Sequence, residues 1–329
     1  MRVKIGGVQM KKVLVTGGAG YIGSHMLSLL LNQGYKVEVI DNFSTGFKSR
    51  IPMEVEVHDR SIEDSVFLSE LFSTAGFDAV IHFAGLKSVE DSFTQRDRYL
   101  TNNYLATQNL VDLATKFEVS KMIFSSSAAV YGNRFKSTKF REIDLCSPVN
   151  PYGESKFLSE EYIREHSKSS VTDFVILRYF NVVGALSKEL SDSSGTNLFP
   201  QIIKSLKSNS EFRIYGGDYQ TKDGSAVRDY IHVQDLVEAH LVALETNSTR
   251  APRNPSILNL GSGSGFTVLE IAQAFEDITG LKLNKKIGPR RIGDPAEVIA
   301  DTTLAGEYLN WQPRFSIRDM VYSSWISSN

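Results

Sequence analysis

Two residues suited to proton transfer, Tyr152 and Lys156, stand four positions apart in a stretch with helical periodicity. On a helix, residues i and i+4 lie one turn apart on the same face, so the phenol and the amine would be neighbours. A free tyrosine has a pKa of about 10, and lowering it to about 7 requires about 4 kcal/mol of differential interaction. A nearby positive charge favours the phenolate. The spacing therefore predicts a tyrosine that transfers a proton with a lysine beside it.

Three consecutive serines, residues 125–127, end a β-rich apolar run shortly before this helix. We expect Ser127 to lie beside Tyr152 and to hydrogen-bond an oxygen that gains and loses a proton. Ser125 and Ser126 fit two interpretations equally well, as part of the site or as residues that cap the end of a strand.

Three glycines with a regular spacing, Gly17, Gly20 and Gly23, follow the apolar run 13–16 and precede a helical stretch. In a dinucleotide site the first glycine makes a tight turn, the second lets the backbone approach a pyrophosphate, and the third lets helix and strand pack closely. The helix N-terminus adds free N–H groups and a positive dipole. Asp41 ends the next predicted strand, where a carboxylate can accept hydrogen bonds from an adenosine ribose and would repel the 2′-phosphate of NADP. These features predict bound NAD.

The elements that must position these residues alternate regularly through the first half of the chain. We predict strands at residues 13–16, 36–41, 55–59, 79–84, 122–126 and 174–180, and helices at residues 24–32, 62–74, 101–117 and 152–167. Strand and helix in alternation imply right-handed parallel crossovers, and ligands bind at the carboxyl ends of such strands. The predicted fold class is α/β, a doubly wound (Rossmann) parallel sheet.

The regularity breaks after about residue 181. Residues 184–197 are rich in Ser, Gly and Asp, and residues 216–224 contain few apolar side chains. We therefore predict an NAD-binding Rossmann domain at residues 10–180 and a smaller C-terminal α/β part at residues 181–329 that binds substrate. In this second part we expect loops rather than another full sheet, with some segments returning to the first domain.

Composition excludes several classes of protein. With 41% hydrophobic residues, 22% charged residues and a formal net charge of -2 in 329 residues, the chain is typical of a globular enzyme and has no basic excess for nucleic acid. It has no run of about 18 apolar residues, so we expect no membrane span. Cys146 is the only cysteine, which permits no intrachain disulfide and favours a cytoplasmic location. The six histidines show no ligand-like spacing, so we expect no metal site.

The glycine spacing resembles that of the short-chain dehydrogenase/reductase superfamily, and the chain length favours its extended branch. Five motifs are similar to successive signatures of the UDP-glucose 4-epimerase family: TGGAGYIGSH (16–25), DNFSTG (41–46), HFAGLKSV (82–89), FSSSAAVYG (124–132) and VRDYIHV (227–233). This resemblance implies an isomerase that interconverts UDP-galactose and UDP-glucose. Tyr152 would remove the proton of the 4-hydroxyl while tightly bound NAD takes hydride from carbon 4. The 4-keto sugar would then rotate within the site and take the hydride back on its other face.

The same resemblance assigns residues to the two ligands. For the cofactor it implies Gly17, Gly20, Tyr21, Ile22, Gly23, Asp41, Asn42, Asp59, Lys87, Asn102, Tyr152 and Lys156. For the UDP-sugar it implies Ser127, Tyr152, Phe180, Asn181, Asn197, Leu198, Tyr215, Arg228, Arg291, Asp294 and Val298. Among these, Arg228 and Arg291 would hold the diphosphate, because forked guanidinium donors suit its oxygens.

Val298 bears on substrate choice. In the resembling family the residue at this position borders carbon 2 of the sugar, and a tyrosine there excludes an acetamido group. A valine would leave room, so the N-acetylated pair UDP-GlcNAc and UDP-GalNAc becomes a second expected substrate pair. The alternative is that Val298 only begins a buried apolar run.

Other functions remain open at this level. A nucleotide-sugar 4,6-dehydratase needs an acid and a base where Ala128 and Ala129 stand, and two methyl groups cannot move protons. A UDP-glucuronate decarboxylase is a further alternative, as is a dinucleotide-sensing protein without turnover, although the latter has no need of the Tyr152 and Lys156 pair. The family also implies a homodimer, in which helices 101–117 and 152–167 pair with those of a second subunit.

Overall fold

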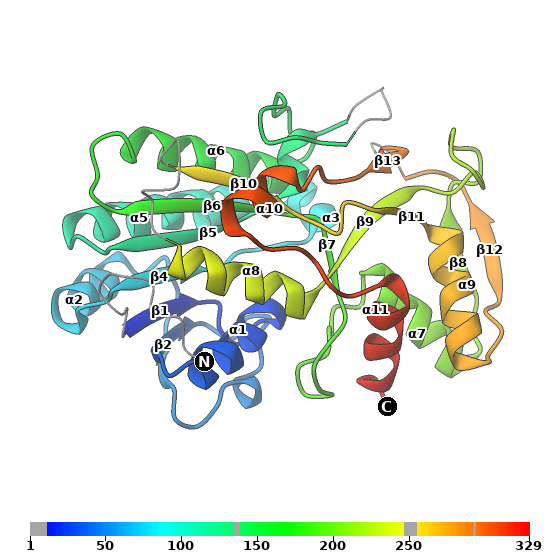
Figure 1. Ribbon diagram of the computed structural model, residues 1–329, viewed down its shortest axis with the longest axis horizontal. Coiled ribbons are helices and arrows are strands. Elements are labelled where there is room, and N and C mark those ends of the chain that lie inside the picture. Colours follow the sequence, from blue (N-terminus) through cyan, green and yellow to red (C-terminus); the bar gives the residue numbers. More distant parts are fainter. Residues whose placement is uncertain (1–11, 134–138, 247–254, 292–293) are drawn as a thin grey trace.

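A parallel sheet of seven strands forms the centre of the molecule in the computed structural model, which describes residues 12–133, 139–246, 255–291 and 294–329 (Figure 1). In spatial order the strands are β10 (Ser256–Leu260), β6 (Asp173–Tyr179), β5 (Lys121–Ser127), β4 (Ala79–His82), β1 (Lys12–Thr16), β2 (Lys36–Asp41) and β3 (Glu56–Asp59). All neighbouring pairs are parallel. The predicted fold class is therefore confirmed.

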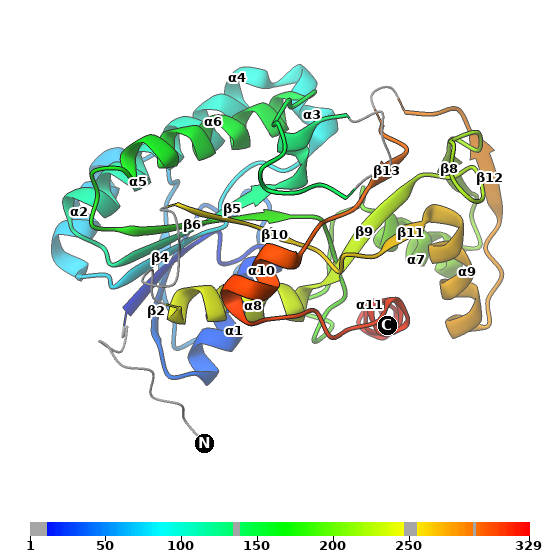
Figure 2. The ribbon, with the colours of Figure 1, turned by 45° about the horizontal axis from the view of Figure 1, so that its top comes forward.

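Helices cover both faces of this sheet. On one face lie α1 (Tyr21–Asn32), α8 (Val233–Glu245) and α10 (Thr303–Leu309), which share an apolar core with strand residues such as Val13 and Val39. On the other lie α2 (Ser65–Ala75), α5 (Ala106–Lys116) and α6 (Pro151–His166), packed on Leu14 and Val80. Figure 2 shows α5 and α6 running side by side over their face. Because both faces are covered, every residue of β6 is buried.

One predicted helix differs from the structure. Within residues 101–117 the chain forms a π-helical turn, Leu100–Leu105, and then α5, and two short helices, α3 (Val89–Thr94) and α4 (Arg96–Tyr99), precede this stretch. The apolar periodicity shows the helical character of this stretch but not the wider turn inside it. Such turns occur frequently at functional sites, and this one carries Asn102 and Asn103.

The part beyond residue 181 contains more strands than the sequence indicates. Around β9 (Val227–His232) lie β7 (Asn181–Val183), β11 (Gly265–Thr267) and β13 (Glu297–Val298), and β8 (Phe212–Tyr215) pairs with β12 (Lys285–Gly288). Most of these strands have only two to four residues, too few to show a period of two in the sequence, and residues 184–197 and 216–224 contain no strand, as expected. Meanwhile β10 crosses back and pairs with β6 in the large sheet.

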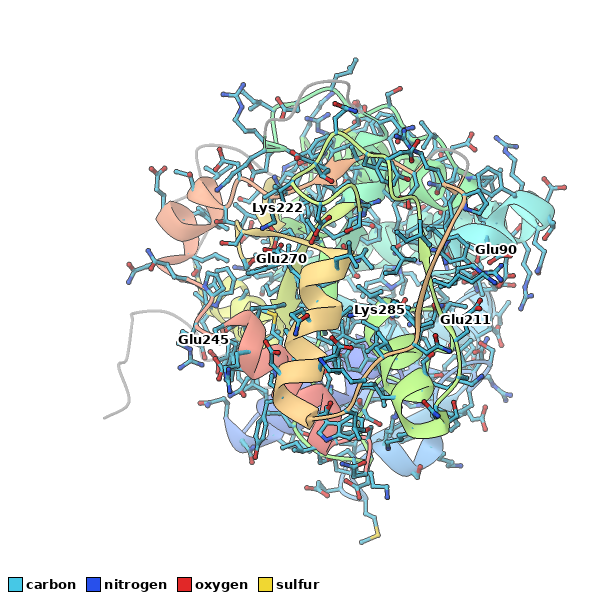
Figure 3. All side chains as sticks on the ribbon, turned by 90° about the vertical axis from the view of Figure 1, so that its right-hand side faces the viewer. Glu90, Glu211, Lys222, Glu245, Glu270 and Lys285 are labelled. Carbon is cyan, nitrogen blue, oxygen red and sulfur yellow. The ribbon has the colours of Figure 1, made fainter. Side chains whose placement is uncertain are left out.

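Three helices complete this smaller part: α7 (Leu198–Ser208), α9 (Val268–Thr279) and α11 (Ile317–Ile326). They enclose a separate apolar core that includes Phe199, Phe275 and Val321. Figure 3 looks onto this end of the molecule, where Lys222 forms an ion pair with Glu270 near the start of α9. Within the described ranges, no helix has the length and apolarity that crossing a membrane requires.

A buried ion pair ties α6 to the large sheet. Arg178 of β6 donates to Glu160 of α6 through Nε, at 3.0 Å, and through Nη2, at 2.6 Å. Both side chains are at most 2% exposed. Arg178 also donates to the Tyr131 hydroxyl at 3.0 Å, and Ser126 donates to Glu160. The remaining donors and acceptors of the pair are thereby satisfied, which a buried charge requires.

We expect Glu160→Gln to lower the free energy of unfolding by about 3 to 5 kcal/mol, because it leaves the buried Arg178 charge without its partner. Glu161→Gln is the matched control: Glu161 is 47% exposed and pairs with Arg164 on the surface, so its loss should cost at most about 0.5 kcal/mol. Urea unfolding followed by circular dichroism measures both, and equal effects would contradict this role of the buried pair.

Candidate functional site

A large cleft of about 1030 Å³ opens at the carboxyl ends of the central strands. Both parts of the chain line it, from the glycine turn after β1 to the segment around β13. The cleft brings together every cofactor-binding and substrate-binding residue predicted from the sequence except Asp59. That exposed side chain stands at the end of β3, directly beside Asp41 in the sheet register.

The glycine turn has the geometry that a pyrophosphate site requires. Gly17 has a φ of +73°, and a Cβ there would lie 2.6 Å from the backbone N of Ala84. A Cβ on Gly23 would lie 2.2 Å from the carbonyl oxygen of Gly17. At Gly20 the added atom would meet one neighbour, at 3.2 Å, so that position is open for a ligand to approach. The residues fit a dinucleotide.

The helix after this turn begins without a side-chain cap. Gly20 is the N-cap of α1, and Tyr21, Ile22 and Gly23 form its first turn. The first N–H groups of a helix have no partner within it, and together with the helix dipole they favour an anion. The predicted role of Tyr21 and Ile22 beside the cofactor phosphates is consistent with this position.

Asp41 holds the turn from the neighbouring strand. Its carboxylate accepts hydrogen bonds from the backbone N–H of Ala19, at 2.9 Å, and of Phe43, at 2.8 Å. Burial raises the pKa of Asp41, these two N–H groups lower it, and nearby Asp59 raises it. A carboxylate has about four acceptor sites, so Asp41 can still accept bonds from ribose hydroxyls, with exposed Asn42 next to it.

Three consecutive serines of β5 contact three successive turns of α6. The backbone carbonyl of Ser125 accepts a hydrogen bond from Lys156 Nζ at 2.9 Å. Ser126 donates its hydroxyl hydrogen to Glu160, and Ser127 hydrogen-bonds the Tyr152 hydroxyl. Ser126 is therefore more than a strand-end cap, since its side chain anchors Glu160, whereas Ser125 contacts Lys156 only through its backbone carbonyl.

The start of α6 is fixed by its own sequence. The Asn150 side chain accepts a hydrogen bond from the backbone N–H of Gly153 at 2.8 Å, and Pro151 occupies the first helical position. Both choices favour a helix beginning at this point. A Cβ on Gly153 would lie 2.5 Å from the Ala129 carbonyl oxygen, so the glycine lets the helix approach the end of β5 closely. Tyr152 is thereby placed against Ser127.

Burial sets the protonation of the two central residues. It raises the pKa of Tyr152 above its ordinary value; the hydrogen bond with Ser127 lowers this pKa and Tyr99 raises it. Burial also lowers the pKa of Lys156 to about 8, against a smaller raising effect of Glu160. Burial of the phenol outweighs the hydrogen bond with Ser127, so the pKa of Tyr152 stays above its ordinary value in the protein alone.

Asn103 is a positioning residue that the sequence did not reveal. Its side chain accepts from the backbone N–H of Leu86 at 2.8 Å and donates to the Leu86 carbonyl at 2.9 Å. It thus fixes the segment that carries Lys87 into the cleft. Its neighbour Asn102, the residue predicted for the cofactor, also lines the cleft and donates to Glu63 at 2.6 Å. The sequence feature that could have indicated Asn103 is the pair of adjacent asparagines, Asn102 and Asn103, in a helical stretch.

At the other end of the cleft stand the predicted diphosphate residues. Arg228 forms an ion pair with Asp294 and donates to the Val227 carbonyl at 2.7 Å. The guanidinium of exposed Arg291 stacks over the Tyr215 ring, 4.1 Å from its centre. Two cations and an aromatic ring thus lie together, an arrangement suited to a base attached to a diphosphate.

Four further predicted substrate residues line the cleft between these ends. Phe180 is buried after β6, and Asn181 is exposed at the start of β7. Asn197 precedes α7 and donates to Asp192 at 2.7 Å, while Leu198 begins that helix.

Val298 stands beside Arg228, its partner in the register of β13 and β9. The side chain is half-buried, lines the cleft, and packs against an apolar cluster that contains Tyr131 and Phe180. The strand is only two residues long, and the apolar residues Val298 and Ile299, both half-buried, lead to buried Ala300, so both interpretations of Val298 remain open.

Outside the cleft, one group of side chains could offer metal ligands, although the spacing of the histidines in the sequence indicates no metal site. Glu38, Glu56 and His58 lie within 4.8 Å of one another on β2 and β3. Glu38 already pairs with Lys12 at 2.6 Å and with His58 at 3.0 Å, so the protein itself satisfies this buried carboxylate without an ion.

Comparison with known proteins gives matches over nearly the whole chain. A relative from Pisum sativum, the bifunctional UDP-glucose 4-epimerase and UDP-xylose 4-epimerase 1, is 40% identical over 96% of this chain and 95% of its own. A UDP-glucose 4-epimerase structure from Stenotrophomonas maltophila, with bound NAD and formylated UDP-arabinopyranose, has a TM-score of 0.90 and 36% identity, covering 97% of this chain and 98% of that one. The UDP-Glc/GlcNAc 4-epimerase of Campylobacter jejuni has a TM-score of 0.83 and 34% identity, covering 97% and 99%.

The family model that matches is described as the NAD dependent epimerase/dehydratase family, and it spans residues 13–261. That range contains the glycine turn, Asp41, the three serines and the Tyr152 and Lys156 pair, so the resemblance seen in the sequence motifs is confirmed. On this match and on its full-length relatives, the chain belongs to the NAD dependent epimerase/dehydratase family.

Proposed function

We propose that this protein is a UDP-hexose 4-epimerase that interconverts UDP-galactose and UDP-glucose with tightly bound NAD. One observation carries the proposal: a single cleft holds the glycine turn at one end, the arginines Arg228 and Arg291 at the other, and Tyr152 with Ser127 in its lining. Relatives with this activity match the chain over at least nine tenths of its length.

The protein's own groups bind, orient and move a proton. Arg228 and Arg291 hold the diphosphate, and the glycine turn with Asp41 holds the dinucleotide. Tyr152 accepts the proton of the sugar's 4-hydroxyl and later returns it, while Ser127 shares a hydrogen bond with the same oxygen. NAD, when bound, supplies a hydride acceptor at carbon 4 and a positively charged ring that favours the Tyr152 phenolate. Because the hydride returns to the sugar, the net redox change is zero.

The dehydratase alternative finds no support at the site. Ala128 and Ala129 form the start of a short 3-10 helix, Ala128–Tyr131, and both line the cleft next to Ser127. Elimination of water across carbons 5 and 6 needs an acid and a base, and these two positions offer methyl groups. Epimerisation needs one proton-transferring group, which Tyr152 provides.

The same cleft supports a broader substrate range. Val298 is half-buried beside Arg228 and lines the cleft, and its side chain is smaller than that of a tyrosine. The Campylobacter jejuni relative is described as acting on both UDP-Glc and UDP-GlcNAc. We therefore extend the proposal to the N-acetylated pair UDP-GlcNAc and UDP-GalNAc.

The two parts of the chain would bind different ligands in the cleft. Residues 10–180 would bind NAD and residues 181–329 would bind the UDP-sugar, with β10 returning to the large sheet.

A cytoplasmic location is part of the proposal. The single cysteine, Cys146, is half-buried, and low cysteine usage suits a reducing cytoplasm.

A homodimer is the proposed assembly. One large apolar side chain next to α6, Leu105 of the π-helical turn that leads into α5, is 50% exposed in the single chain. Its exposure favours pairing of α5 and α6 with a second subunit as a four-helix bundle.

We expect Tyr152→Phe to keep the fold and the bound NAD but to lower turnover by about 10²-fold or more, because only the proton-transferring hydroxyl is removed. Product formation from UDP-galactose, followed by NMR, measures this. Tyr162→Phe is the control on the same helix, since Tyr162 donates to Asp112 outside the cleft. Failure of the wild type to form UDP-glucose would overturn the proposed function, and a Tyr152→Phe enzyme of normal turnover would overturn the assigned base.

Val298→Tyr should abolish activity on UDP-GlcNAc and retain activity on UDP-glucose. The ring would occupy the space for the acetyl group, and a displacement of about 1 Å from the reactive geometry can cost about 10²-fold. Initial rates with both substrate pairs measure the effect. Val298→Leu is the control, because leucine adds less volume than tyrosine. A wild type inert toward UDP-GlcNAc would contradict the proposal.

Sedimentation velocity should show a dimer for the wild type and a shift toward monomer for Leu105→Glu, because a buried unpaired carboxylate opposes association. Leu304→Glu is the matched control, since Leu304 is 39% exposed on α10, which covers the opposite face of the sheet. A monomeric wild type would disprove the proposed assembly.

A further inference from the structure

One segment of the smaller part, residues 184–197, is attached directly to the larger part, and we call it the strap. Tyr21 donates its hydroxyl hydrogen to the Gly184 carbonyl at 2.5 Å. The backbone N–H of Leu186 donates to His25 Nε2 at 3.3 Å. Burial lowers the pKa of His25 to about 4, so this imidazole stays neutral and keeps the acceptor. Both contacts come from α1, the helix that follows the glycine turn.

The third attachment is a buried arginine from the loop after β2. Arg50 ends the 3-10 helix Lys48–Arg50 and is 7% exposed. Its guanidinium donates to the Glu189 carbonyl at 3.0 Å, the Ser191 carbonyl at 2.6 Å and the Ser193 hydroxyl at 3.3 Å. Three hydrogen bonds from one side chain thus hold three alternate residues of the strap, and a buried guanidinium requires such hydrogen-bond acceptors.

The loop that carries Arg50 is also part of the dinucleotide end of the cleft. It starts at Asp41, and residues 44–47 line the cleft together with Arg50 itself. Ala19, next to Gly20 in the glycine turn, accepts a backbone hydrogen bond from Phe47 at 3.1 Å. Arg50 therefore connects the strap to the loop that encloses the predicted adenosine site.

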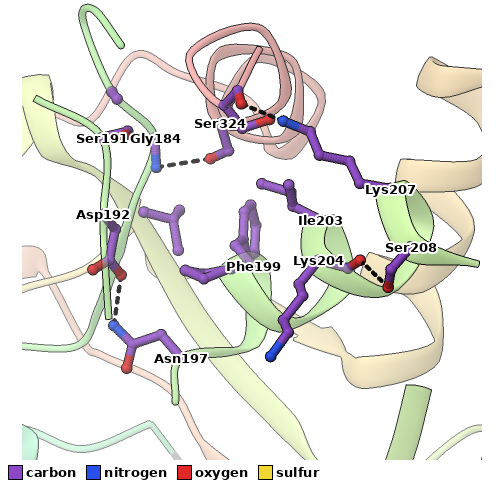
Figure 4. Close-up of a pocket in the computed structure, with 14 residues that line it drawn as sticks. Gly184, Ser191, Asp192, Asn197, Phe199, Ile203, Lys204, Lys207, Ser208 and Ser324 are labelled. Carbon is purple, nitrogen blue, oxygen red and sulfur yellow. Dashed lines mark hydrogen bonds between the residues drawn. The ribbon is translucent and has the colours of Figure 1, made fainter. Parts of the chain in front are cut away.

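The strap separates two spaces. Ser193, Ser194 and Thr196 line the large cleft, and Ser191 lines a second cavity of about 500 Å³ between the strap, α7 and α11. Asp192 and Asn197 line both. Figure 4 shows this second cavity, with Asp192 bonded to Asn197 on one side and Gly184 bonded to Ser324 of α11 on another. Open space behind the strap gives it room to withdraw from the cleft.

We propose that Arg50 is a positioning residue that holds the strap against the cleft and slows the release of the bound dinucleotide. The inference rests on the proposed function for the identity of the ligand, NAD. An enzyme that returns its hydride in every cycle gains nothing from exchanging the cofactor. Arg50 acts through the strap on the rate of cofactor release, and the chemical step with NAD bound does not involve it.

The test compares Arg50→Met with Lys48→Met. Lys48 lies in the same short helix and is exposed, so its replacement controls for loss of a cation from the loop. Each protein is loaded with NAD and diluted into an alcohol dehydrogenase mixture that reduces released NAD, so that absorbance at 340 nm reports the release rate. We expect release to become at least about tenfold faster in Arg50→Met, since hydrogen bonds from a charged donor are lost. Lys48→Met should match the wild type.

Turnover at saturating NAD separates positioning from general damage. In Arg50→Met the kcat for UDP-galactose should fall by a smaller factor than the one by which the release rate rises. Should Arg50→Met fail to fold, Arg50→Lys decides the question: it keeps the charge but lacks the fork, and it should release NAD faster than wild type. An unchanged release rate in whichever variant folds overturns the proposal.

The release assay contains no UDP-sugar, so its result does not depend on whether the protein epimerises UDP-galactose. A wild type that binds NAD but does not epimerise UDP-galactose would overturn the proposed function alone. A wild type that binds no NAD would overturn both.

Discussion

The register between β5 and α6 is the constraint on which the site depends. Three successive serines contact residues one helical turn apart, so Ser127 meets Tyr152, Ser125 meets Lys156 and Ser126 meets Glu160. A shift of one residue in either element would break all three contacts at once. The buried Glu160 and Arg178 pair then ties the same helix to β6, so Tyr152, the proposed base, stands on a helix fixed at two adjacent strands.

The contacts between β5 and α6 position Tyr152 and Lys156, but burial does not make the two side chains reactive. It raises the pKa of Tyr152 and lowers that of Lys156 to about 8, and both shifts favour the neutral forms. A phenol that keeps its proton in the protein alone requires an added positive charge near it before it can act as a base. The site is therefore suited to chemistry that begins only when a positively charged cofactor ring lies beside Tyr152.

The smaller part lines the other end of the cleft, where we propose that the UDP-sugar binds, through short strands held on β9. Arg228 and Val298 are neighbours across β9 and β13, so the residue proposed to hold the diphosphate and the residue proposed to gate carbon 2 move as one unit. Buried Asp229 strengthens this unit, because its carboxylate accepts hydrogen bonds from the backbone N–H groups of Ser262, Gly263 and Ala300. Two separate segments, residues 262–263 and the segment at Ala300, thus converge on one side chain next to Arg228.

The sequence by itself determined the fold class, the glycine turn, Asp41 and the pair of Tyr152 and Lys156, because each depends on short-range spacing within one strand, turn or helix. Tertiary structure decided what depends on contacts between distant segments. It showed that Ser126 anchors Glu160, that Asn103 rather than Asn102 holds the Leu86 backbone, and that Arg50 reaches the strap about 140 residues later. It also decided the protonation of Tyr152, since a pKa follows from the burial and neighbours of the folded side chain, which no local spacing specifies.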